Sequence, residues 1–187
     1  MKRIASMALM ICLGVAAVYA QRSVNMTSSG TSGASAVNLQ QPNTSNDEDN
    51  FAGTGTLGQF TVRQIRAISN SPTPSSTCSG PSKIYFLELA GGAVFRFQDG
   101  SLLNARLTQG SDCIDFSELF AHCTLVLQIT GGTGRFQNAT GTLTFTEAVA
   151  PTLFDTSNNP VFFFSTGAYT GTISGVRMGE APQEVRP

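Results

Sequence analysis

Two glutamates each continue a run in which every second residue is apolar. In a β-strand such residues share one face, so the carboxyl group of each glutamate could lie inside the protein. Glu147 continues the alternation of Leu143 and Phe145, and Glu88 stands two residues after Phe86. If these faces point inward, burial raises the pKa of the carboxyl group, which can then act as an acid, act as a base or orient a ligand. We favour the alternative, in which the strand ends just before Glu147 and the side chain of Glu147 lies in solvent. The same two alternatives apply to Glu88.

The stretch DCIDFSELFAHC holds two cysteines, the only histidine and three carboxylates. A metal could be bound by Cys113, His122 and Cys123 together with Asp112 or Asp115. However, adjacent residues of a strand point to opposite faces, so His122 and Cys123 would diverge, and the spacing matches no known ligand motif. We therefore expect no metal site, and nothing else in the chain indicates a cofactor.

Three cysteines lie beyond the N-terminal apolar stretch: Cys78, Cys113 and Cys123. In an exported protein a disulfide is the better expectation for such residues. Cys113 and Cys123 flank one short connection, so we predict that they pair. The pairs Cys78–Cys113 and Cys78–Cys123 stay open as alternatives, because Cys78 lies in a loop rich in Ser and Pro that can move toward a partner.

The glycine-rich stretch ITGGTGRFQNATGTLTFT does not fit a nucleotide site. Gly132 and Gly134 supply GxG, but Gln137 occupies the third glycine position of the dinucleotide fingerprint, and a strand pattern follows where a helix is required. The lysine of a phosphate-binding P-loop is also missing. The residue types instead predict a sharp turn, in which glycines tolerate positive φ and Phe136 anchors the loop in the core.

The same stretch resembles the GGTGxFxxAxG signature of the allene oxide cyclase-like barrel group, which also contains the dirigent proteins. The matching positions are Gly131, Gly132, Gly134, Phe136, Ala139 and Gly141. The resemblance spans about eleven residues and implies an eight-stranded antiparallel barrel with an internal apolar cavity. Plant cyclases of this group isomerise a fatty-acid epoxide, and dirigent proteins steer radical coupling. Their pocket residues do not carry over, because only the structural motif matches.

Apolar residues alternate with polar ones through most of residues 53–175, which predicts a single all-β domain. The alternating runs lie at 57–65, 83–89, 93–97, 103–107, 123–129, 141–149, 161–166 and 167–175. About eight strands with short connections predict a closed antiparallel eight-stranded barrel, because closure removes unpaired strand edges. A β-sandwich is the alternative.

The chain begins with the features of a secretory signal peptide. Lys2 and Arg3 precede an apolar run at 4–18, and Val18 and Ala20 fit the −3 and −1 positions of a cleavage site. The run is shorter than the ~20 residues that span a bilayer. We therefore predict a signal peptide at 1–20 and a secreted or periplasmic protein that has no membrane span after cleavage.

Two further segments have compositions that are typical of flexible chain. Residues 21–52 consist almost entirely of small and polar residues and end in an acidic run, so we predict a disordered polar linker. Residues 176–187 are predicted to form a flexible tail.

Composition also limits the class of function. The formal net charge is −1, and Lys83 is the only lysine after the N-terminal stretch, which does not fit binding to nucleic acid. We favour a secreted barrel that binds a small apolar molecule or has a structural role. One alternative is a cyclase or isomerase that uses Glu147 or Glu88 in the barrel cavity, and another is an extracellular interaction module. Inward carboxylates would favour the enzyme.

Overall fold

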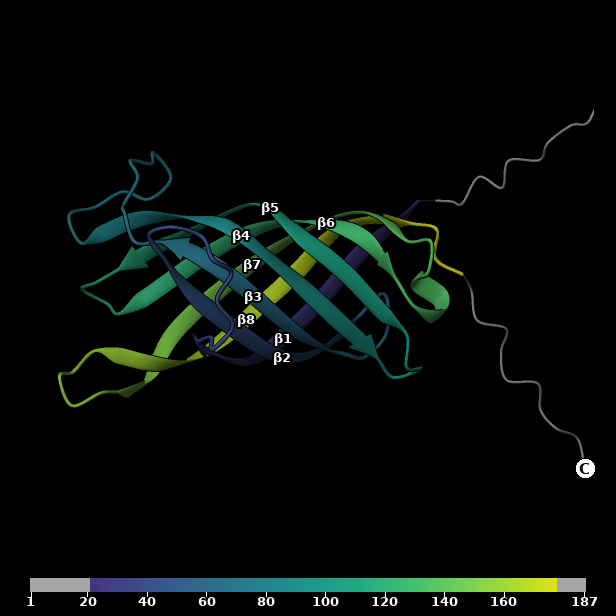
Figure 1. Ribbon diagram of the computed structural model, residues 1–187, viewed down its shortest axis with the longest axis horizontal. Helices are drawn as coiled ribbons and strands as arrows, with labels where there is room; N and C mark the ends of the chain where they lie inside the picture. The colour runs from purple at the N-terminus through teal and green to yellow at the C-terminus, as the bar shows by residue number, and fades with distance from the viewer. Residues whose placement is uncertain (1–20, 178–187) are drawn as a thin grey trace, which may run out of the picture.

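Residues 21–177 of the computed structural model are described here, and they form a closed antiparallel barrel of eight strands (Figure 1). Each strand pairs with the next, and the last pairs with the first. This confirms the predicted barrel. The strands are β1 (Arg22–Ala34), β2 (Thr44–Gly55), β3 (Phe60–Ser69), β4 (Lys83–Phe97), β5 (Leu102–Asp115), β6 (Phe120–Gly132), β7 (Thr140–Phe154) and β8 (Pro160–Ser174).

Two predictions about the chain ends fall mostly outside this range. The signal peptide at 1–20 lies outside the described residues, as does the predicted tail except for Val176 and Arg177. Val176 packs against the core, and the backbone N–H of Arg177 donates to the carbonyl oxygen of Arg135. Within the described residues, no helix is long and apolar enough to cross a membrane.

The segment 21–52 is not a linker: it forms β1 and most of β2. Both strands pair on each side, and β1 closes the barrel against β8. Composition misled the prediction because many inward positions of these strands are not apolar. Ser28 and Ser32 are buried in β1, and Asp49 is buried beside Phe51 in β2. A barrel interior accepts such residues where neighbouring strands supply polar partners.

The predicted number of strands is right, but two pairs of predicted runs merge. The runs 83–89 and 93–97 together form β4, and the runs 161–166 and 167–175 together form β8. In β4 a register shift opposite Ala67 and Ile68 marks a bulge, which reverses the alternation of inward and outward positions. The eight predicted runs therefore correspond to six strands, and β1 and β2 are the remaining two of the eight.

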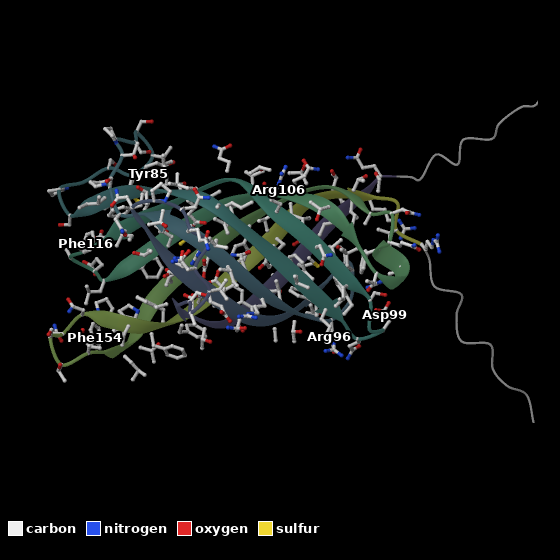
Figure 2. All side chains as sticks on the ribbon, viewed as in Figure 1. Tyr85, Arg96, Asp99, Arg106, Phe116 and Phe154 are labelled. Atoms are coloured by element: carbon white, nitrogen blue, oxygen red, sulfur yellow. A yellow bond between two sulfur atoms is a disulfide. The ribbon has the colours of Figure 1, made fainter. Side chains whose placement is uncertain are left out.

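The barrel interior is apolar toward one end and polar toward the other. The connections β1–β2, β3–β4, β5–β6 and β7–β8 meet at the polar end, which we call the long-loop end. Figure 2 shows Phe116 and Phe154 at this end and Asp99 at the opposite one. The apolar half is filled by packed side chains, with the Tyr169 ring 4.2 Å from that of Phe145 and 4.9 Å from that of Phe95.

The glycine-rich loop closes the apolar end. It contains a short 3-10 helix, η1 (Gly134–Phe136), and Phe136 is fully buried with its ring 4.8 Å from that of Phe97. Gly134 has φ +57°, and a Cβ there would collide with the side chain of Ser101. A Cβ on Gly132 would collide with the carbonyl oxygen of Leu102, and Gly131 and Gly141 also have positive φ. The loop therefore serves as an end plug.

The disulfide joins Cys78 to Cys113, with 5.6 Å between their Cα atoms, so the predicted pair Cys113–Cys123 is wrong. The register explains the difference. Cys113 lies opposite His122, which is exposed, whereas Cys123 lies opposite Asp112, and both of these are buried. Cys113 therefore faces outward, within reach of the β3–β4 loop that carries Cys78, and Cys123 faces the interior and forms no disulfide.

Candidate functional site

The polar half of the barrel holds five buried charged side chains, which we call the charged layer. Each is exposed by 5% or less. They come from five different strands: Asp49 (β2), Arg66 (β3), Glu88 (β4), Asp112 (β5) and Glu147 (β7).

Arg66 lies at the centre of the charged layer. Its Nη1 donates to Glu147 Oε2 at 3.0 Å and to Glu88 Oε1 at 3.2 Å, and its Nη2 donates to Asp49 Oδ1 at 3.3 Å. Gln64 Nε2 donates to the second oxygen of Asp49 at 2.8 Å. One guanidinium thus connects carboxylates of three other strands across the barrel.

Two β-bulges turn carboxylates of this layer inward. In β5, Leu103 and Leu107 are buried, and simple alternation from them would point Asp112 outward. A register shift between Leu107 and Gln109 inserts one residue, which brings Asp112 to the inner face. Simple alternation from the buried residues in the second half of β4 would likewise point Glu88 outward. The bulge in β4 brings Glu88 to the inner face.

Glu147 reaches the interior without a bulge. The strand β7 continues without interruption from Leu143 through Glu147 to Val149, and all three side chains are buried. The interpretation that we favoured, in which the strand ends before Glu147, is therefore wrong. Glu88 is likewise inside the barrel, and the two glutamates meet at the same nitrogen of Arg66.

Buried carboxyl groups outnumber buried cations in the layer. Among the residues that the structure describes, four buried carboxyl groups face one buried guanidinium. Burial raises the pKa of Asp49 to about 7, although Arg66 acts in the opposite direction. Burial also raises the pKa of Glu88 well above its usual value, and nearby Asp112 adds to this effect. Burial opposes the charge of Arg66, but its carboxylate neighbours hold its pKa well above the usual range.

Several buried polar atoms of the layer, and the hydroxyl group of Tyr169, have no hydrogen-bond partner among the described residues. They include two donors and three acceptors: Arg66 Nε, Tyr169 OH, Glu147 Oε1, Glu88 Oε2 and Asp112 Oδ1. Leaving one such atom unpaired costs roughly 1–3 kcal/mol. A concentration of them in one part of the interior calls for an explanation, such as a catalytic role or a bound ion or water molecule.

An apolar row lies between the charged layer and the long-loop end. Ile84, Ile114 and Val149 occupy one cross-strand row with Ala121, one step beyond the row that contains Asp112 and Glu147. Ile84 is 37% exposed and Ile114 half-buried, so this end of the interior is less tightly covered than the layer beneath it. A small molecule that approaches the charged layer from the long-loop end meets these side chains first.

Sequence reasoning found two residues of the layer and missed the other three as site residues. Arg66 follows directly after the predicted run 57–65, and its alternation with Val62 and Gln64 could have revealed it. Asp49 was assigned to the linker. Asp112 was considered as a metal ligand, but the bulge that turns it inward leaves no simple trace in the sequence.

A shallow hollow of about 790 Å³ lies elsewhere, on the outer wall over β1 to β4, where Thr27, Thr61 and Arg96 are among its lining residues. It has no contact with the charged layer.

Comparison with known proteins gave no match to a protein-family model and no match to a curated protein. The function proposed below therefore rests on the geometry of the charged layer.

Proposed function

We propose that this protein is a secreted or periplasmic isomerase or cyclase that transfers a proton within the charged layer. The observation that carries the proposal is that one potential base and two hydrogen-bond donors inside the barrel are buried and unpaired. Glu147 Oε1, Arg66 Nε and Tyr169 OH are all buried and have no partner among the described residues. Burial, followed by the charges of Asp49 and Glu147, raises the pKa of Tyr169 well above its usual value, so its hydroxyl remains a donor.

These three groups suit a substrate that carries a carbonyl or epoxide oxygen. Hydrogen bonds from Arg66 Nε and Tyr169 OH would stabilise negative charge as it develops on that oxygen. Glu147 Oε1 would take a proton from a neighbouring carbon and return it at another atom, so the substrate rearranges with no net gain or loss of atoms. Proton transfer of this kind typically accelerates a reaction by 10² to 10⁴.

The surroundings indicate a neutral, largely apolar substrate. The row of Ile84, Ile114 and Val149 offers apolar contact on the way to the layer. The excess of carboxylates would repel an anionic group placed among them. The resemblance to the allene oxide cyclase-like group supports an epoxide, and the charge of the layer favours an ester over a free fatty acid.

The proposal is tested with the methyl ester of an unsaturated fatty-acid epoxide as probe. Wild-type protein should convert it to a product of equal mass, and in D₂O the product should gain deuterium at the carbon that is reprotonated. We expect Glu147→Gln to lose at least about 100-fold in rate, because an amide cannot accept the proton. Glu118→Gln, which alters an exposed glutamate in the β5–β6 turn, should keep the wild-type rate.

Equal rates for Glu147→Gln and wild type, with both correctly folded by circular dichroism, would contradict this assignment. So would the absence of turnover by wild type for both the epoxide ester and a matching unsaturated ketone.

Binding of a small apolar molecule without turnover is the second candidate function, and the apolar row favours it. In that case wild type and Glu147→Gln would bind the ester equally well and neither would convert it. The interaction-module function stays a prediction. The apolar side chains that the β7–β8 hairpin exposes, such as Phe162 and Phe164, are the feature that it would use.

A further inference from the structure

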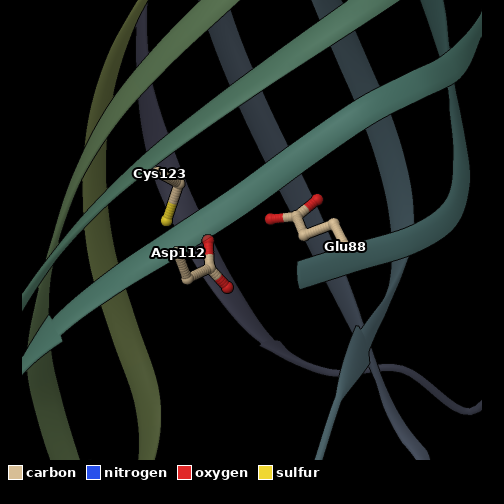
Figure 3. Close-up of side chains that lie close together, drawn as sticks. All are labelled: Glu88, Asp112 and Cys123. Atoms are coloured by element: carbon tan, nitrogen blue, oxygen red, sulfur yellow. The ribbon is translucent and has the colours of Figure 1, made fainter. Parts of the chain in front are cut away.

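A second group of side chains in the charged layer takes no part in the proposed proton transfer. Glu88, Asp112 and Cys123 come from the neighbouring strands β4, β5 and β6, and Asp112 lies directly opposite Cys123 in the register. One ligand atom of each residue lies within 4.8 Å of the others. Figure 3 shows the two carboxylates turned toward one another, with the sulfur of Cys123 beside Asp112.

Two oxygens of this group that receive no hydrogen bond from a donor in the described part of the chain are an independent sign of a ligand. Glu88 and Asp112 are 5% and 3% exposed, and Glu88 Oε2 and Asp112 Oδ1 have no partner among the described residues. Arg66 holds Glu88 through the other oxygen, Oε1. That contact fixes the direction of the Glu88 carboxyl group and leaves Oε2 available. Residues that contact a metal ligand, without binding the metal themselves, commonly orient the ligand in this way.

From this geometry we propose that Glu88, Asp112 and Cys123 bind a divalent transition-metal cation of the Zn²⁺ type inside the barrel. Two carboxylates with one thiolate suit zinc better than calcium or magnesium, which require several oxygen ligands. Three protein ligands leave a fourth position open. Cys123 binds as the thiolate, and its proton is released to the solvent when the metal enters.

A bound metal ion would also reduce the charge imbalance of the layer. Four buried carboxylates face one guanidinium, and a divalent cation would offset part of that excess. The competing explanation is that Glu88 and Asp112 share a proton and no metal binds. The two explanations differ in what happens when metal is added to protein that has been freed of it.

The first experiment titrates the chelator-treated protein, purified as the whole exported chain, with ZnCl₂ in a calorimeter. We expect one zinc per chain, together with release of a proton that makes the measured heat depend on the buffer. Titration with CoCl₂ should give a thiolate-to-cobalt absorption band in the near ultraviolet. An absence of saturable zinc binding would overturn the proposal in favour of the shared proton.

Variants locate the site. Cys123→Ser should abolish the cobalt–thiolate band, and both Cys123→Ser and Asp112→Asn should weaken zinc binding by more than about tenfold. His122→Ala and Glu118→Gln are the controls, because both residues are exposed and point away from the interior. Wild-type zinc affinity in folded Cys123→Ser, or equal losses in the two controls, would show that zinc binds elsewhere and would overturn the proposal.

The metal site and the proposed reaction can fail separately. Glu147→Gln should bind zinc within a few-fold of wild type, because Glu147 is not one of the three ligands. If Asp112→Asn does not fold, Cys123→Ser alone decides the outcome, since serine replaces a buried cysteine with little change in size.

Discussion

Arg66 shows how much of this interior depends on one side chain. Its guanidinium contacts Asp49, Glu88 and Glu147, and it is 3% exposed. Removing one partner of a buried ion pair leaves the other charge without compensation, which typically costs 3–5 kcal/mol. The same residue orients Glu88 and Glu147, so its loss should affect both stability and site geometry.

We therefore expect Arg66→Met to lower the free energy of unfolding by about 3–5 kcal/mol, measured by urea denaturation. Arg63→Met is the matched control, because Arg63 stands on the outer face of β3 and pairs with Glu48 in solvent. That variant should change stability little. Similar losses in the two variants would show that the buried cluster has no special role in stability.

Asp49 also makes stability depend on pH. Burial raises its pKa from the ordinary 3.8 to about 7 in the folded protein, so the folded state binds more protons than the unfolded state between these values. Asp47 adds to this effect with a pKa of about 6, which burial also raises. The free energy of unfolding should therefore fall as the pH rises from about 4 to 7.

The check is the melting temperature between pH 4.5 and 7.5. Wild type should melt at a higher temperature at the acidic end, and Asp49→Asn should show a weaker dependence because the residue no longer titrates. The groups that interact with Asp49 include Arg66, Gln64, Glu147, Asp47, Glu88 and Tyr169. A melting temperature that rises with pH across this window would contradict the assignment.

At the scale of single elements, the glycine-rich loop and the bulged strands determine what the interior contains. The loop requires glycine where the backbone has positive φ and also lies against another strand. At Gly134 both conditions hold, since φ is +57° and Ser101 occupies the position of a Cβ. At Gly100 only the first holds, because φ is +78° but no atom lies within 4 Å.

We expect Gly134→Val to cost on the order of 1–3 kcal/mol from backbone strain, plus the cost of displacing Ser101. Gly100→Ala, with strain but no collision, should cost less. Phe136→Ala should cost roughly 3–5 kcal/mol, because the ring is fully buried. Chemical denaturation of the three variants measures these differences, and equal stability of Gly134→Val and wild type would show that the loop tolerates a side chain.

The elements also explain how far sequence reasoning could go. The alternation of Leu143, Phe145 and Glu147 made an inward Glu147 visible as one of two alternatives, because β7 is unbroken, but we favoured the wrong one, in which the strand ends before Glu147. Asp112 could not be placed in this way, because one extra residue in β5 reverses the faces after Leu107. The strands β1 and β2 were missed because their inward positions include serines and aspartates, whose burial depends on partners in other strands. Arg66 is one of these partners.

For the whole molecule, the disulfide ties the long β3–β4 loop to the outer wall. Cys78 and Cys113 are separated by 35 residues in the sequence. By loop entropy, closing a segment of that length stabilises the folded state by at most ~4 kcal/mol. We expect peptide mapping without reduction to find these two cysteines joined, and the double variant Cys78→Ser, Cys113→Ser to lose stability up to that amount.

A linked peptide that contains Cys123 would contradict the disulfide assignment. The single variant Cys123→Ser is the control for this measurement, because it should leave the linkage between Cys78 and Cys113 unchanged.

The closure of the barrel by β1 and β8 brings the two ends of the folded chain together. Arg22 pairs with Ile173, at the end that the glycine-rich loop plugs and opposite the long-loop end. A solid support or a fusion partner attached through either end of the domain would therefore leave the long-loop end turned outward. The same adjacency should allow a circularly permuted chain, in which a short linker joins the old ends and new ends open in the β7–β8 turn, to keep the same barrel.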